Sequence, residues 1–433
     1  MPLATQTPPA LAHCQSCGAE LRPGSDHCPA CGRLLWERSS QITLAITLLL
    51  LLGGVGLTQY LVNLHRMTEH GLAVRWFTRG DEAMQAHAAR FAAEAYRTAL
   101  NYDPQNQQYR LRLAQALVAD NRLAEAHAHL LSLWEEEPAD GEVNLTLARL
   151  EAKRKRFNDA VRYYNDAING VWQQEPRKQR TAARFELARY FLQQQQGARA
   201  QAELLALLAD APSDPADQLA LGQMLLQVNE PAHALQAYNG LLAKDSSNAQ
   251  AWMGTGEAQL ALGNYIEAER ALAKAVDHDP KLDDARQQLQ LTREILSINP
   301  GLRGLPLAER ANRVARAFTA AMSRLSACAA EQGVNLSAPT SAAPATASVA
   351  TAPAAETAAQ PAPPNALQLL YASGQQKQRD ATVEALRRNP DALEPIMQYV
   401  FEVERTAAPI CPNMDVTDRA LLTLAQHESE TIK

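Results

Sequence analysis

Small and large apolar residues recur at a fixed spacing between residues 74 and 282. In each unit a small residue is followed four positions later by Tyr or Leu, and three positions after that by Ala or Leu, so the three share one face of a helix. The six sets are Ala92/Tyr96/Ala99, Ala126/Leu130/Leu133, Ala160/Tyr164/Ala167, Ala200/Leu204/Leu207, Ala234/Tyr238/Leu241 and Ala268/Leu272/Ala275. Their first alanines are 34, 34, 40, 34 and 34 residues apart. This period predicts stacked helical units that bury their apolar faces against one another.

Each of the six apolar sets is preceded by another predicted helix. It carries a bulky residue and then a small one that lets two helices approach closely, and the pairs are Trp76 with Gly80, Leu113 with Ala114, Leu147 with Ala148, Leu187 with Ala188, Leu221 with Gly222 and Trp252 with Gly256. Prolines 104, 138, 212 and 280 fall where one helix stops and the next begins. Ser246 takes that place in the fifth unit. In the third, Trp172 takes it, and six extra residues, 175–180, predict a longer helix or loop.

These marks resemble the tetratricopeptide repeat (TPR) family, over roughly half of the chain. The resemblance implies an all-α fold, a TPR α-solenoid of about six helix-turn-helix repeats in residues 73–298. Polar residues in 283–298 suit a capping helix at its end. An aromatic content of only 5%, beside abundant Ala, Leu and Gln, also argues against a large sheet.

TPR arrays bind proteins or peptides chiefly on a concave face lined by the first helix of each unit. The family pattern places there an apolar strip of Leu111, Leu145, Phe185, Leu219 and Met253, and beside it Gln115, Arg149, Arg189, Gln223 and Glu257. Two arginines flanked by amides could hold a peptide that ends in, or carries, a carboxylate. The alternative is that Arg149 and Arg189 are solvated or paired with Glu151 and Glu186.

Four of the six cysteines lie near the N-terminus in two Cys-x-x-Cys-Gly turns, Cys14 with Cys17 and Cys28 with Cys31. Each turn offers two thiolates to a tetrahedral ion, and the glycines let backbone amides turn toward the sulfurs. This pattern resembles a zinc ribbon in residues 13–35 and predicts bound Zn²⁺. A pair of disulfides or a redox dithiol is the alternative, although so short a segment has no other means of ordering itself.

From Ile42 to Val62 there is no charged residue. At about 1.5 Å per residue this stretch spans roughly 30 Å, the thickness of a bilayer core. Trp36 and Tyr60 lie near its ends, where aromatic rings favour the interface. We therefore expect one permanent transmembrane helix at residues 41–64, and a short bridge at 65–75 between it and the first repeat.

The orientation of this anchor follows from cysteine chemistry, because Arg22, Arg33 and Arg38 before the span balance three arginines after it. A four-thiolate site survives best in a reducing compartment. We expect a single-pass protein of a cell (inner) membrane, with the ribbon in the cytoplasm and the repeats outside it, in the periplasm of a bacterium.

The end of the chain shows helical spacing in 305–330 and again in 366–428, which predicts a C-terminal helical domain. Between them, residues 336–365 are rich in Ala, Pro and Thr and predict a flexible linker, as residues 1–12 predict a disordered lead. If the two helical segments form one bundle, Cys328 and Cys411 come within reach of each other, and a disulfide is a hypothesis.

The predicted function is binding. A net charge of −6 gives no electrostatic reason to expect nucleic acid as a partner, and the common catalytic motifs are absent, so no enzyme is expected. Membrane-tethered TPR proteins serve as scaffolds, assembly factors or accessory subunits of larger membrane complexes, which is what the resemblance implies. An alternative is a transmembrane regulator whose ribbon binds nucleic acid or a cytoplasmic protein. The weakest hypothesis is a small enzyme in the tail from Ala366.

Overall fold

The structure is a computed structural model that describes residues 12–23, 25–33, 38–210, 212–336 and 365–431 of the 433-residue chain. The predicted disordered lead and flexible linker lie outside the described residues, apart from their end residues. The chain divides into two compact units, Met1–Val171 and Trp172–Lys433, and each is described by itself.

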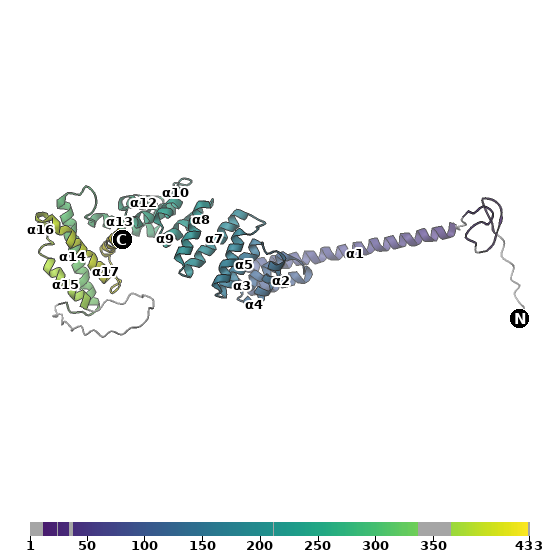
Figure 1. The fold of residues 1–433 in the computed structure, drawn as a ribbon, viewed down its shortest axis with the longest axis horizontal. Helices are drawn as coiled ribbons and strands as arrows, with labels where there is room; N and C mark the ends of the chain where they lie inside the picture. The colour runs from purple at the N-terminus through teal and green to yellow at the C-terminus, as the bar shows by residue number, and fades with distance from the viewer. Residues whose placement is uncertain (1–11, 24, 34–37, 211, 337–364, 432–433) are drawn as a thin grey trace. The chain divides into compact units, whose positions relative to one another are not determined.

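Among its described residues, the first unit holds a short antiparallel sheet and six helices; helices α1 to α5 are labelled in Figure 1. Its elements are β1 (Ala12–His13), β2 (Glu20–Leu21), α1 (Arg38–Gln85), α2 (Ala89–Tyr102), α3 (Gln107–Ala119), α4 (Leu123–Glu136), α5 (Gly141–Lys153) and α6 (Phe157–Asn169). From the second half of α1 onward, each helix packs against the next one in the chain. The first alanine and the aromatic or leucine of each apolar set here are buried, as the period predicts.

The second unit continues with helical pairs and ends in a helical bundle. Its helices are α7 (Pro176–Gln193), α8 (Gly197–Asp210), α9 (Pro215–Gln227), α10 (Pro231–Leu242), α11 (Ala249–Ala261), α12 (Tyr265–His278), α13 (Asp283–Ile298), α14 (Leu307–Glu331), α15 (Asn365–Lys377), α16 (Val383–Arg388), the 3₁₀ turn η1 (Pro390–Ala392), α17 (Leu393–Ala407) and α18 (Val416–Thr431). The predicted all-α fold class, with helix-turn-helix repeats, a capping helix and a C-terminal helical domain, is confirmed.

An Asn or Asp side chain begins the first helix of four repeats. Its oxygen accepts a backbone N–H two or three residues further on, at Asn106, Asp140, Asp214 and Asn248. Such a cap satisfies one of the amides that the first turn of a helix leaves unpaired. Each cap lies two residues after the predicted proline or, in the fifth unit, after Ser246. The proline therefore ends one helix and the cap starts the next.

The turn between the two helices of a repeat contains one residue in the left-handed region. These residues are His87, Asn121, Lys155, Gln195, Asn229 and Gly263, with φ between 57° and 74°. They recur with the period of the apolar sets. Glycine adopts this conformation at least cost, yet five of the six described turns have another residue there. The six extra residues of the irregular unit lengthen α7, which has 18 residues and begins at Pro176.

Tyr238 of α10 packs into the space that two glycines leave open. A Cβ atom on Gly222 of α9, or on Gly254 of α11, would overlap its ring. Tyr238 is 1% exposed, so the ring cannot swing into water without losing its packing. The close approach of three successive helices therefore depends on glycine at both positions.

Gly254→Ala is expected to destabilise the second unit by about 1–3 kcal/mol, because the added methyl group overpacks a filled core. Urea unfolding followed by circular dichroism measures this change. The matched control is Gly240→Ala on α10, where a Cβ meets nothing within 4 Å; that change should stabilise the helix by up to about 1 kcal/mol. Equal stability of the two variants would contradict the packing role of Gly254.

Helix α1 is continuous from Arg38 to Gln85, so the bridge predicted at residues 65–75 is itself helical. No proline interrupts this stretch, Gly71 is its single glycine, and His65 pairs with Glu69 one turn later at 3.1 Å. Thr43–Gln85 contains a window long and apolar enough to cross a membrane, and none of that window is buried within the structure. The same helix carries Trp76 and Gly80 of the first repeat.

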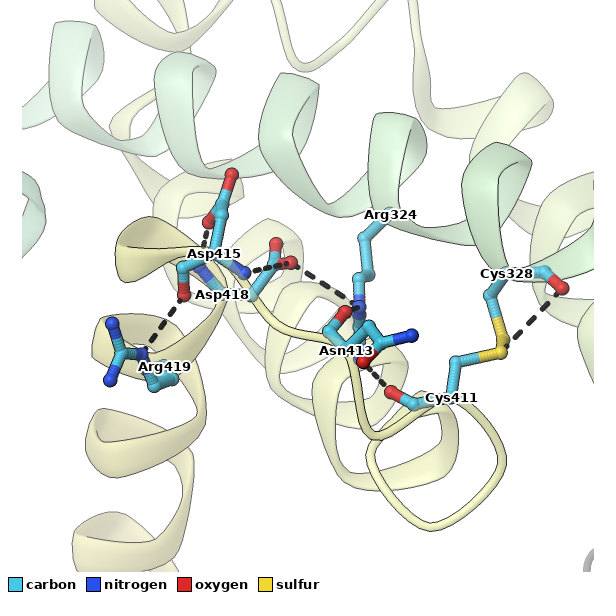
Figure 2. Close-up of polar contacts among 7 residues, drawn as sticks. All are labelled: Arg324, Cys328, Cys411, Asn413, Asp415, Asp418 and Arg419. Carbon is cyan, nitrogen blue, oxygen red and sulfur yellow. Dashed lines mark hydrogen bonds and ion pairs between the residues drawn. A yellow bond between two sulfur atoms is a disulfide. The ribbon is translucent and has the colours of Figure 1, made fainter. Parts of the chain in front are cut away.

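In the bundle, Arg324 and a cross-link hold the segment between α17 and α18 to α14 (Figure 2). Cys328 and Cys411 are joined by a disulfide, with their Cα atoms 5.7 Å apart. One turn earlier on α14, the Arg324 guanidinium donates to the carbonyls of Cys411 and Asn413 and lies 3.4 Å from the Asp418 carboxylate. The segment is thus attached to α14 by one covalent bond and one buried cation.

Glu404 of α17 lies fully buried near this cluster. Burial, together with the carboxylates of Asp418 and Asp415, raises the pKa of its carboxyl to about 8, against the opposing effect of Arg324. One guanidinium faces three carboxyl groups here, so Glu404 holds its proton at neutral pH.

Candidate functional site

The four N-terminal cysteines form one cluster. Their sulfur atoms all lie within 4.8 Å of one another, with 3.7 Å between Cys14 and Cys31 and 3.5 Å between Cys17 and Cys28. Four thiolates at about 2.3 Å from a tetrahedral Zn²⁺ would be roughly 3.8 Å apart. The sequence-predicted ligands are therefore brought together at a spacing that fits this ion, and all four are free cysteines.

The two turns of this cluster have the same backbone geometry. Gly18 and Gly32 have φ of 74° and 67°, and their amides donate to the carbonyls of Cys14 and Cys28. The strand pair β1–β2 joins the two flanks of the first turn. A backbone amide two residues on, from Ser16, lowers the pKa of the Cys14 thiol to about 6, and that of Ala30 lowers the pKa of Cys28. The first cysteine of each turn therefore favours the thiolate form that binds metal. Against the Ala19 amide, which lowers it, hydrogen bonds with the Cys28 and Cys31 side chains raise the pKa of the Cys17 thiol to about 12.

The residues predicted to line the concave face differ in their exposure. In the first unit Leu111 and Leu145 are buried within the array, and in the second unit Phe185 is 2% exposed. These three members of the predicted apolar strip are therefore covered within the array. Leu219 and Met253 remain half-buried and accessible.

Gln115 of α3 has contacts within the array. Its side-chain amide donates to Glu142 at 3.0 Å and to Thr146 at 3.4 Å, both on α5. Arg112 donates to its oxygen at 2.8 Å. Gln115 thus holds one first helix against the next. Arg149, further along this unit, is exposed.

In the second unit, equivalent positions on α7, α9 and α11 carry Arg189, Gln223 and Glu257. Arg189 and Gln223 are exposed and Glu257 is half-buried. Burial, with a contribution from Asp284, raises the pKa of the Glu257 carboxyl. Burial and Asp214 raise the pKa of the Asp217 carboxyl, against the opposing effects of Lys178 and of the nearby Arg189. The face thus has a basic group beside Asp217 and an acidic end at Glu257.

Sequence reasoning missed Asp217 and Asp284 as members of this face. Both lie in the first turn of a first helix, where an acidic residue is common because it suits the positive end of the helix dipole. Their position thus has an ordinary structural cause, and only the folded arrangement shows that they approach Arg189 and Glu257.

Family models of the tetratricopeptide repeat match residues 83–150, 185–246 and 219–285. These stretches cover the repeats of both units apart from the start of the first repeat and residues 151–184, and the matched repeats are tetratricopeptide repeats. No curated protein matches the sequence.

Several solved structures are similar in fold. YrrB, described as a TPR protein with an unusual peptide-binding site, is 18% identical over 45% of this chain and 97% of its own, with a TM-score of 0.35. PilW, a type IV pilus biogenesis factor, is 19% identical over 50% and 98%, with a TM-score of 0.38. The pilF protein of Pseudomonas aeruginosa is 16% identical over 51% and 97%, with a TM-score of 0.36.

Proposed function

We propose that this chain is a membrane-anchored scaffold that holds partner proteins on its TPR array. The observation that carries the proposal is the series of equivalent accessible positions on α7, α9 and α11, where Arg189, Gln223 and Glu257 follow one another beside Leu219 and Met253. A row of charged, amide and apolar groups at the repeat spacing suits an extended or helical peptide. No catalytic group is required for this role.

The anchor in this proposal is the apolar part of α1, residues 42–62. Its support is the length of the helix and the absence of covering side chains over the apolar window. Exposing an apolar helix of this length to water is unfavourable in free energy, whereas the hydrocarbon core of a bilayer accommodates it. The first repeat then begins within the same helix, a short distance after the span.

The four-thiolate cluster would hold Zn²⁺ in a structural role. Cys14, Cys17, Cys28 and Cys31 would occupy all four tetrahedral positions, which leaves none for a substrate. All four sulfur atoms lie within 4.8 Å of one another, Cys14 and Cys28 are buried, and backbone amides favour their thiolate forms, so the residues present fit the ion. The ion would supply the folding energy that so short a segment lacks.

The proposed orientation places the zinc cluster in the cytoplasm and the array with the C-terminal domain outside it, in the periplasm of a bacterial cell. Its support is that free thiols and the Cys328–Cys411 disulfide occur on opposite sides of the apolar segment in the chain. Free thiolates suit a reducing compartment and disulfides an oxidising one.

Crosslinking in native membranes tests the scaffold role. The Arg149→Glu/Arg189→Glu double variant is expected to lose at least five-fold in the amount of its crosslinked partners, measured by quantitative mass spectrometry, because a reversed charge repels a bound carboxylate. The control is Arg270→Glu, an exposed arginine on the second helix α12 of its repeat. A partner set that both variants leave unchanged would exclude this face as the binding surface.

A further inference from the structure

A cavity of about 280 Å³ lies in the second unit, where the last repeat meets the C-terminal bundle. Its lining is drawn from α12, from the 299–301 segment after α13, and from α14, α17 and α18. The base is apolar and consists of buried side chains, namely Val314, Leu393, Met397, Phe401 and Leu424. These residues belong to the core of the bundle, so the cavity has a solid floor.

Two carboxylates stand together at the edge of this cavity. Glu394 of α17 and Glu428 of α18 both line it, and both accept from the same amide: Gln398 Nε2 lies 3.2 Å from Glu394 Oε1 and 2.7 Å from Glu428 Oε1. The shared donor brings two negative charges to one place. Arg310 of α14 is a further lining residue and is exposed.

Neighbouring contacts fix the remaining walls. Arg313 donates to the carbonyls of Leu296 at 2.7 Å and Asn299 at 2.9 Å, which holds the loop wall in place. On another side the His427 ring meets Tyr265 edge to face, with centroids 6.1 Å apart. His427 also lies so close to Gly263 that a Cβ atom there would overlap it. The cavity is therefore formed before any ligand arrives.

We propose that this cavity receives the side chain of a lysine or arginine from a partner polypeptide. The alkyl stem of such a side chain would pack on the apolar base, and its charged head would meet Glu394 and Glu428. Long basic side chains at protein surfaces bury their stems and keep their heads in polar surroundings in the same way. The two carboxylates favour a cationic head over a purely apolar side chain, and they repel an anion. The exposed guanidinium of Arg310 is placed to meet backbone carbonyls of the same partner. This site is separate from the proposed peptide-binding face of the repeats.

Capped pentapeptides with a central lysine, arginine or norleucine test the proposal. Saturation-transfer NMR on the full chain in detergent micelles is expected to detect the lysine and arginine peptides and to give a signal at least five-fold weaker for norleucine, which has a comparable alkyl stem without the charge. Glu394→Gln/Glu428→Gln should reduce the lysine signal at least five-fold. Leu424→Trp, which fills the cavity, should abolish it.

The matched control is Glu402→Gln/Glu331→Gln, which removes two exposed carboxylates of α17 and α14 outside the cavity. This variant should bind like the wild type. Equal signals for the norleucine and lysine peptides, or an unchanged signal in the Glu394→Gln/Glu428→Gln variant, would overturn the proposal. Binding of n-butylamine as tight as that of the lysine peptide would overturn the assignment to a polypeptide, because it would make the cavity a site for small amines.

Discussion

A chain in which serine replaces Cys28 is expected to purify without zinc and to lose the ordered structure of residues 12–33. Cys28 is 1% exposed and its sulfur lies 3.5 Å from that of Cys17. Its replacement therefore removes one of the four proposed zinc ligands from a buried position. Zinc contributes about 10–16 kcal/mol to the folding of small metal domains. The wild type should contain one zinc ion per chain by elemental analysis, and the variant less than a tenth of that.

Hydrogen exchange on the same samples separates the metal from the rest of the fold. Peptides from 12–33 should exchange fully in the Cys28→Ser variant and in wild type treated with a chelator, while those from α3 to α12 stay protected. His27→Ala, which alters the exposed neighbour of Cys28, serves as the control and should keep its zinc. Full metal content in Cys28→Ser would rule out the four-thiolate site.

The C-terminal bundle is expected to lose stability as the pH rises from 4.5 to 8, because of Glu404. Its folded pKa of about 8 lies above the ordinary value of 4.5. Between those values the folded chain keeps a proton that the unfolded chain has released, so the contribution is complete below 4.5 and is lost as the pH rises through the folded pKa. A shift of this size corresponds to on the order of 5 kcal/mol at about 1.4 kcal/mol per unit.

Hydrogen exchange of α17 and α18 peptides at several pH values, corrected for the intrinsic rate, measures this loss on the full chain. Glu404→Gln removes the titrating group and keeps its shape, so its opening free energy should change far less across the same range. Glu402→Gln, on the exposed side of α17, should reproduce the wild-type slope. A wild-type profile as flat as that of Glu404→Gln would show that Glu404 is ionised in the folded chain.

The period of the apolar residues was sufficient to predict the helices of the repeats, because burial on one face leaves a regular mark in the sequence. The caps were less visible, since Asn106 or Asp214 looks like any polar residue after a proline until its side chain is seen to accept a backbone amide. The left-handed turns left almost no mark: Lys155 and Gln195 adopt a conformation that their side chains do not favour, held by the helices on either side.

The sequence pattern did not report on packing at two places. Residues 65–75, predicted as a bridge after the span, continue the helix of the span without a break. Leu111, Leu145 and Phe185 occupied positions assigned to an open surface, and neighbouring helices cover them.

The Cys328–Cys411 disulfide was a hypothesis that depended on the two helical segments forming one bundle, since the cysteines are 83 residues apart, and the structure contains it. No sequence signal predicted the contacts of Arg324 with the carbonyls of Cys411 and Asn413. Nor does any sequence signal bring Glu394 next to Glu428. The Cys-x-x-Cys spacing, by contrast, predicted all four members of the thiol cluster, because their geometry is encoded within one short segment.

If the apolar part of α1 spans a bilayer as proposed, the unbroken helix joins the span rigidly to the first repeat. Each residue in a helix turns the following chain by about 100° and advances it by about 1.5 Å. The number of residues between the proposed span and the first repeat therefore sets the direction in which that repeat faces around the helix axis. Torsion or tilt of the span therefore passes directly into the first repeat. A flexible connection would transmit neither the torsion nor the tilt.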